Sequence, residues 1–406
     1  MAEAVGSEAG RPAHGKGALA VLFFLHAAAL AAYTVPLANV LKAYGIGDGA
    51  ITMAFCTGAL AAFISPMVAG SLADRRVPPE RLLAGLCAAS AVFLILTFRA
   101  IEGRWGAPWV LGWMMVYALC SAPGFGLVTS IVLSRLGDAR REFGPVRAAA
   151  TVGWMVAAFF ISRVVHGDFS VSSGYWAAGI FLVEAVFCMG MQPTYPGASR
   201  EPRRWRDFFG WEALQLLRHP DHRIIFAASA VFSALISTFY RYSAAHLADL
   251  GDPSPSATMG VAQVLEGVAM FGLAGLLTRF RLKWVLVAGL VAGALRLGLM
   301  ATNEQALLVV SIALHGPVFV LFYPTSQLYL EQRVDPGLRA QSQALLSLLN
   351  GGVGSLSGYL VLGFWHGRCT SEWGVDWTRF WTPLAVATGI LAVFFVGAYR
   401  GQGRSE

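Results

Sequence analysis

An amide and a carboxylate inside one apolar run are the residues best suited to chemistry. Gln263 and Glu266 lie three positions apart within the run 256–278, so both side chains fall on one face of a helix. The run is long enough to cross a bilayer, where a charged side chain costs at least ~2.5–3.5 kcal/mol. Such a residue usually faces a partner, a ligand or a water-filled path. We therefore expect Glu266 to bind a solute and a proton.

A second polar face is predicted in the run 144–165. Arg147, Thr151 and Trp154 follow the spacing i, i+4, i+7 and share one side of a helix. A guanidinium, a hydroxyl and an indole suit the rim of a site for a polar solute that contains a ring. An arginine that reaches the cytoplasmic interface, beside a contact between small residues, explains the pattern equally well.

An aromatic face is predicted in the run 305–330. His315, Phe319 and Phe322 fall at helical spacing there, and one glycine and two prolines interrupt the run. Broken helices and aromatic faces line the solute sites of transporters. A stripe of aromatic residues that faces lipid is the competing interpretation.

Four more ionisable residues lie within apolar runs. For Glu184 we favour a carboxylic acid that burial keeps neutral. For Arg296 we favour a structural pair or a side chain that reaches the interface. Arg241, between two tyrosines, suits either a cation–π contact or a role in transport. His26 could titrate near neutral pH, although a single membrane histidine is more often a hydrogen-bonded core residue.

The elements that position these residues are transmembrane helices. Of the 406 residues, 56% are hydrophobic and 13% are charged, and the mean hydropathy is +0.59. Apolar runs of the length that spans a hydrocarbon core of ~30 Å recur along the chain, without the alternation of barrel strands. We therefore predict an all-α membrane protein with twelve spans. The runs are 17–41, 50–72, 82–100, 107–133, 144–165, 172–193, 223–247, 256–278, 283–302, 305–330, 340–364 and 378–398.

The distribution of the net charge of +7 indicates how the protein is oriented in the membrane. Most of the 30 lysine and arginine residues fall in the amino tail, the connections after even-numbered spans and the carboxyl tail. The opposite loops hold Lys42, Arg99, Arg104, Arg163, Arg368 and Arg379. By the positive-inside rule both termini lie in the cytoplasm. We expect a multi-pass protein of the plasma (inner) membrane, with the lipid bilayer and not nucleic acid as its partner.

One long polar connection, 195–222, divides the twelve spans into six and six. Four prolines and five arginines occur in or next to it. Two pseudo-symmetric six-helix bundles joined in this way resemble the major facilitator superfamily. The predicted divisions are a cytoplasmic tail at 1–16, a bundle at 17–194, a cytoplasmic linker at 195–222, a second bundle at 223–398 and a tail at 399–406.

The loop after the second span resembles a signature of that superfamily. Gly70, Asp74 and Arg75 follow its pattern of a glycine and an aspartate before basic residues. The glycine allows close helix approach, and the aspartate can cap a helix end and pair with an arginine to hold one closed state. In the loop after the eighth span, Arg279 stands where the pattern has the aspartate. An ordinary charged turn is the alternative interpretation.

Three segments resemble the nucleoside:proton symporter family of the superfamily. They are FGPVRAAATVGW, VAQVLEG and HGPVFVLFYPTSQLYLEQRVDPGLRAQSQALLSLLNGGVG. Positions that match the family's patterns in spans five, eight and ten are Arg147, Thr151, Gly153, Trp154, Gln263, Glu266, Gly316, Phe319 and Phe322. The similarity extends along the chain and includes His26 and Tyr33. It implies import of nucleosides by proton symport, with the ribose held by the span-eight pair and the base stacked on aromatic rings.

The chain departs from the family at four positions. Ala150 replaces a glycine, Ser237 and Tyr240 occupy positions where span seven carries two amides, and Val320 replaces an aspartate. These departures leave three interpretations open. Glu266 alone couples the proton, the protein couples no proton, or its substrate differs from that of the family. The predicted substrate-binding residues are Arg147, Thr151, Trp154, Gln263, Glu266, Phe319, Phe322, Tyr240, Ser237, His315 and Tyr33.

Two other functions compete with nucleoside symport. One is transport of another polar solute, such as a sugar or a nucleobase, by the same fold. The other is a membrane receptor that transports nothing. An enzyme is not expected, because the chain has no nucleotide-binding loop, G-x-S-x-G elbow or metal-ligand spacing. We expect no cofactor or metal and a functional monomer.

Overall fold

The computed structural model describes residues 15–75, 77–194, 212–335 and 338–401. This part of the chain is mostly helical and contains 12 spans long and apolar enough to cross a membrane. The prediction of twelve spans is therefore confirmed. Most of the predicted linker, 195–211, lies outside the described residues, as does most of the predicted amino tail.

The first six spans surround one apolar core, built from side chains between Leu19 and Met191. Proline cannot donate a backbone hydrogen bond inside a helix, and Pro36 and Pro123 divide the first and fourth spans. The helices are α1 (Lys16–Thr34), α2 (Leu37–Ala43), α3 (Asp48–Arg75), α4 (Pro79–Glu102), α5 (Ala107–Ser121), α6 (Gly124–Leu133), α7 (Ala139–Arg163) and α8 (Ser172–Gly190).

The last six spans surround two further apolar clusters. Turns of π-helix interrupt spans seven and eleven, and such turns are frequent at functional sites. The elements are η1 (Glu212–Arg218), α10 (Pro220–Ile236), η2 (Phe239–Ser243), α11 (Ala244–Asp249), α12 (Pro255–Met259), α13 (Val261–Arg279), α14 (Leu282–Met300), α15 (Gln305–Arg333), α16 (Arg339–Ser347), η4 (Leu348–Gly354), α17 (Ser355–Cys369), β1 (Thr370–Ser371), β2 (Gly374–Val375) and α18 (Trp377–Ala398).

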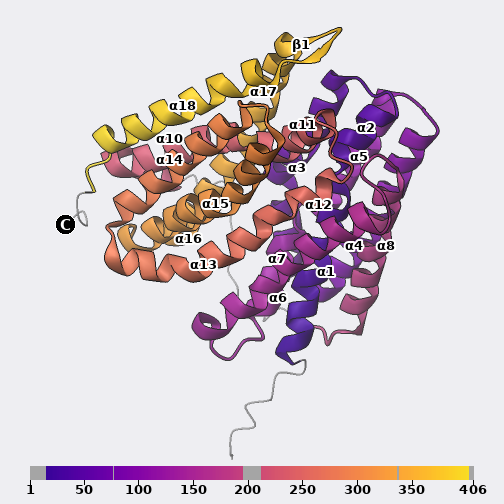
Figure 1. Cartoon of the computed structure of the whole chain (residues 1–406). Helices are drawn as coiled ribbons and strands as arrows, with labels where there is room; N and C mark the ends of the chain where they lie inside the picture. Colours follow the sequence, from indigo (N-terminus) through magenta and orange to yellow (C-terminus); the bar gives the residue numbers. More distant parts are fainter. Residues whose placement is uncertain (1–14, 76, 195–211, 336–337, 402–406) are drawn as a thin grey trace, which may run out of the picture.

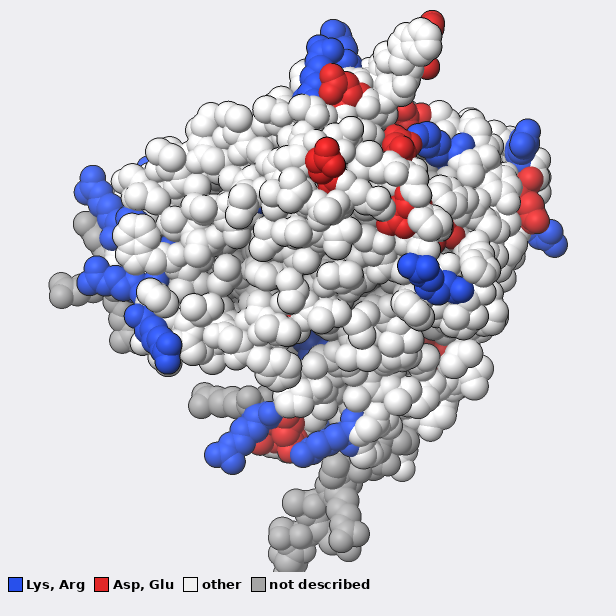
Figure 2. Space-filling view, in the orientation of Figure 1, with Lys and Arg blue, Asp and Glu red and all other residues white. Residues whose placement is uncertain are grey.

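The two groups of spans lie side by side, the first indigo to magenta and the second pink through orange to yellow (Figure 1). They meet where α3 packs on α17, and where α7 packs on α12 and α13. The β1–β2 hairpin projects at one end of the molecule, near α2 and α11, and we call this the hairpin end. Charged residues gather towards the ends of the visible face, and a mostly uncharged band lies between them (Figure 2). Such a band suits the hydrocarbon core of a bilayer.

Candidate substrate and proton site

The predicted amide–carboxylate pair lies on one face of α13. Gln263 Nε2 donates a long hydrogen bond of 3.5 Å to Glu266 Oε2. Gln263 is buried and Glu266 is half-buried. Helix α15 contacts this turn at Gly316. The contact is so close that a Cβ added to Gly316 would lie 2.7 Å from Glu266 Cα. The glycine therefore allows two helix backbones to meet beside the carboxylate.

The facing wall comes from α7, in the first group of spans. Arg147, Thr151 and Trp154 lie on successive turns of one face, as predicted. Gly153 lies away from that face, and a Cβ on it would stand 2.9 Å from Phe24 Cα in α1. Close packing on α1 thus fixes the position of α7.

A guanidinium from one group of spans attracts a carboxylate from the other. Arg147 and Glu266 interact electrostatically across the interface between the groups. The Cζ atom of Arg147 also lies 5.8 Å from the ring centroid of Phe23 and 5.9 Å from that of Phe125. The Arg147 side chain is thus exposed, and its head group lies against these two rings.

Two aromatic rings complete this contact between the groups. Tyr240, in η2, lies with its ring centroid 5.4 Å from that of Trp154, at an interplanar angle of 48°. Tyr240 also meets Phe239 edge-on, with ring centroids 4.9 Å apart. We call Arg147, Trp154, Tyr240, Gln263 and Glu266 the central cluster. Helices far apart in the sequence thus bring together charge, amide and aromatic surface.

The residues of the predicted aromatic face of α15 differ in burial. Phe319 is half-buried. Phe322 is fully buried, with its ring centroid 4.7 Å from that of Phe232. His315 is buried and stacks on Phe239 with centroids 3.6 Å apart. The structure thus places Phe322 and His315 in the packed interior of the second group of spans.

Two other predicted site residues make packing contacts. Ser237 Oγ donates to the Ala234 carbonyl over 2.7 Å and faces Gly358 of α17. The Tyr33 ring meets that of Tyr117 edge-on, with centroids 5.1 Å apart. These two candidate residues, like Thr151, His315, Phe319 and Phe322, lie outside the central cluster.

The predicted gating residues fall at the carboxyl end of α3. Gly70, Asp74 and Arg75 belong to its last turns, and the helix ends at Arg75. Their side chains lie outside the described part of the structure. The expected pairing of Asp74 with an arginine therefore stays a prediction.

A polar network that the sequence reasoning missed links spans seven, ten and eleven. The hydroxyl groups of Ser233 and Tyr323 are 2.8 Å apart, and Ser233 Oγ donates to Asn350 Oδ1 over 3.2 Å. The sequence indicates this network only through single polar residues within apolar runs. Nearby, Arg296 is fully buried and has Cζ 4.9 Å from the ring centroid of Phe239. No described residue accepts a hydrogen bond from the Arg296 guanidinium, so the expected structural pair is not formed. The side chain is fully buried, so it does not reach the membrane interface either.

Ion pairs tie the two groups of spans together at the hairpin end. Arg241 Nη2 lies 3.2 Å from Asp48 Oδ1, and Lys42 Nζ lies 3.0 Å from Asp249 Oδ1. The guanidinium of Arg241 also lies over the ring of Tyr242, 4.6 Å from its centroid. Arg241 therefore combines the expected cation–π contact with an ion pair that closes this end.

The fold and the polar cluster between its two groups of spans define a secondary transporter of the major facilitator type. A crystal structure of the nucleoside transporter NupG has a TM-score of 0.85 at 21% identity, covering 95% of this chain and 99% of that one. A structure of the peptide transporter POT has a TM-score of 0.71 at 18% identity, covering 96% and 95%. These similarities show the fold. The family model described as "Nucleoside H+ symporter" matches residues 15–404, so the chain belongs to this family.

Curated relatives agree with the family. The putative nucleoside transporter YegT of Escherichia coli (strain K12) is 28% identical over 387 residues, covering 91% of this chain and 90% of the relative. Xanthosine permease of the same organism is 26% identical over 372 residues, covering 86% and 87%. The chain is a nucleoside importer and a multi-pass integral membrane protein, and not an enzyme.

Proposed function

We propose that the central cluster binds a nucleoside and a proton together. The observation that carries this proposal is that α7, with Arg147, packs on α13, with Glu266, so that opposite charges from different groups of spans attract across one interface. A proton on Glu266 removes the negative charge and therefore the attraction. Protonation thereby changes the free energy of bringing the two groups together. Such differential stabilisation of two states is what drives alternating access.

The side chains of the cluster suit the two parts of a nucleoside. Gln263 and Glu266 offer a donor and acceptors to the ribose hydroxyl groups, and Thr151 adds a hydroxyl from α7. Trp154 and Tyr240 form an aromatic wall across the interface, on which a base can stack. Stacking of a base on an aromatic side chain contributes ~1–3 kcal/mol.

Glu266 is the proposed proton carrier. The span-ten position at which the family resemblance implies an aspartate is Val320, and its side chain is fully buried. A valine cannot exchange a proton, so the half-buried carboxylate of Glu266 takes this role alone.

The proposed orientation places both termini in the cytoplasm, as the distribution of lysine and arginine predicts. The hairpin end then faces the outside and is closed by the Arg241–Asp48 and Lys42–Asp249 pairs. In this state the central cluster exchanges its ligand with the cytoplasm. One chain supplies both walls of the cluster, so the proposed functional unit is a monomer without nucleic acid.

Uptake into proteoliposomes tests the proposal. We expect saturable accumulation of labelled nucleosides when an inward proton gradient is imposed, and its loss when an ionophore collapses the gradient. Glu266→Gln keeps the shape of the side chain and cannot release a proton. We expect it to lose gradient-driven accumulation and to keep exchange of nucleoside across the membrane. Glu304→Gln, at an exposed carboxylate between α14 and α15, is the control. Gradient-driven accumulation by Glu266→Gln would falsify the coupling assignment.

A second candidate function is transport of another polar solute, such as a sugar or a nucleobase, in addition to nucleosides. Val320, Ser237 and Tyr240, where the family resemblance implies an acid and two amides, favour it. Competition of labelled nucleoside uptake by simple sugars and nucleobases tests it, because a solute that uses the same site lowers the uptake.

A further inference from the structure

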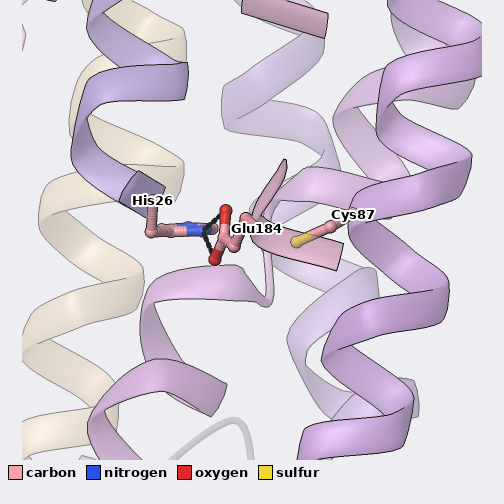
Figure 3. A group of neighbouring side chains, drawn as sticks. All are labelled: His26, Cys87 and Glu184. Atoms are coloured by element: carbon pink, nitrogen blue, oxygen red, sulfur yellow. Dashed lines mark hydrogen bonds and ion pairs between the residues drawn. The ribbon is translucent and has the colours of Figure 1, made fainter. Parts of the chain in front are cut away.

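Three ligand-type side chains converge in the interior of the first group of spans. His26 of α1, Cys87 of α4 and Glu184 of α8 are each at most 2% exposed. His26 Nδ1 lies 2.9 and 3.2 Å from the two carboxylate oxygens of Glu184. One ligand atom from each residue lies within 4.8 Å of the others. The imidazole and the thiol approach the carboxylate from opposite sides (Figure 3).

The surrounding packing fixes the imidazole in this place. A Cβ at Gly124 would overlap the ring of His26, so the glycine after the break in span four makes room for it. The rings of Phe125 and Phe181 meet the imidazole edge-on, with centroids 4.9 and 6.2 Å away. A site held by tight packing of its supporting residues is preorganised for a ligand.

We propose that His26, Cys87 and Glu184 bind a divalent metal ion of the zinc type. Imidazole nitrogen, thiolate sulfur and carboxylate oxygen are the ligand types of zinc sites. A neutral imidazole, a thiolate and a carboxylate carry two negative charges, which a divalent ion balances. Without metal, the same cluster is neutral only with two protons bound, so metal entry releases two protons. Charge balance matters because an uncompensated charge in this interior is very unfavourable.

The geometry requires only small movements. In a tetrahedral site with bond lengths of ~2.0–2.3 Å, the ligand atoms are ~3.3–3.8 Å apart. The three ligand atoms here lie within 4.8 Å of one another. The bound ion would join α1, α4 and α8 and stabilise this group of spans, in which the ring of Phe125 contacts both His26 and Arg147.

Cobalt spectroscopy of the purified, chelator-treated protein tests the site. We expect one Co²⁺ per chain, with visible bands of tetrahedral coordination and a near-ultraviolet thiolate-to-cobalt band, both removed by excess Zn²⁺. Cys87→Ser should lose the thiolate band or weaken it strongly. Cys56→Ser, which removes another buried thiol in a span, should leave the spectrum unchanged. Zn²⁺ should also raise the melting temperature of the wild type and of Cys56→Ser, and raise that of Cys87→Ser much less.

The result is independent of transport, because no nucleoside is present. Absence of a thiolate band in the folded wild type, or an equal band in Cys87→Ser, overturns the proposal and leaves a hydrogen-bonded cluster. His26→Gln, which keeps a polar side chain of similar reach, gives a second test if Cys87→Ser does not fold. It should bind Co²⁺ at least tenfold more weakly, and unchanged affinity overturns the assignment of His26.

Discussion

Gly316 is the point at which α15 touches α13, and alanine at this position tests how strictly the site depends on that contact. The added Cβ would stand 2.7 Å from Glu266 Cα and closer still to the Glu266 nitrogen and the Ala262 carbonyl oxygen. Carbon atoms pack best at ~3.5–4.0 Å, so the helices must separate by ~0.8–1.3 Å or distort. Overpacking of this kind typically costs ~1–3 kcal/mol.

The displacement acts directly on the backbone that carries Glu266, so uptake should fall. A penalty of ~1.4 kcal/mol on the occupied site weakens apparent affinity about tenfold, measured as the half-saturation concentration in proteoliposomes. Gly267→Ala is the matched control, because its added Cβ meets no atom within 4 Å. Alanine there should keep uptake and favour the helix by ~0.8–1.0 kcal/mol. Wild-type uptake by Gly316→Ala, or equal losses in both variants, would refute the reasoning.

Three further variants test the cluster and the closed end. Trp154→Ala removes a stacking surface worth ~1–3 kcal/mol, so the half-saturation concentration should rise about fivefold or more; unchanged uptake kinetics would remove Trp154 from the site. Tyr240→Phe keeps the ring and removes a hydroxyl that we propose bonds the nucleoside, a hydrogen bond worth ~0.5–1.5 kcal/mol, so competition binding should weaken ~2–10-fold, and equal binding would remove this hydroxyl from the proposed site. Asp48→Asn leaves buried Arg241 without its charged partner, so distances between spin labels across the hairpin end should lengthen in more molecules; an unchanged distance distribution would argue against this closure.

The amino-acid sequence by itself determined the number and approximate limits of the spans. Each crossing must be about 20 apolar residues long and must satisfy its own backbone hydrogen bonds, so length and composition suffice to find it. Helical spacing also placed Gln263 with Glu266 on one face, and Arg147 with Thr151 and Trp154 on another. These are properties of single helices, and no second helix is needed to read them.

Only the tertiary structure decided which of those faces meet. Apolar residues cover both the lipid-facing and the protein-facing sides of a transmembrane helix, so periodicity says little about which neighbour a face touches. For this reason spacing put Phe322 in the predicted aromatic face, and packing put it against Phe232 in the core. The contact of Trp154 with Tyr240, and that of His26 with Glu184 across 158 positions, depend on how separate helices pack. Glycine positions contribute to this packing: Gly124 leaves room for the His26 ring, and Gly153 allows α7 to meet the backbone of α1.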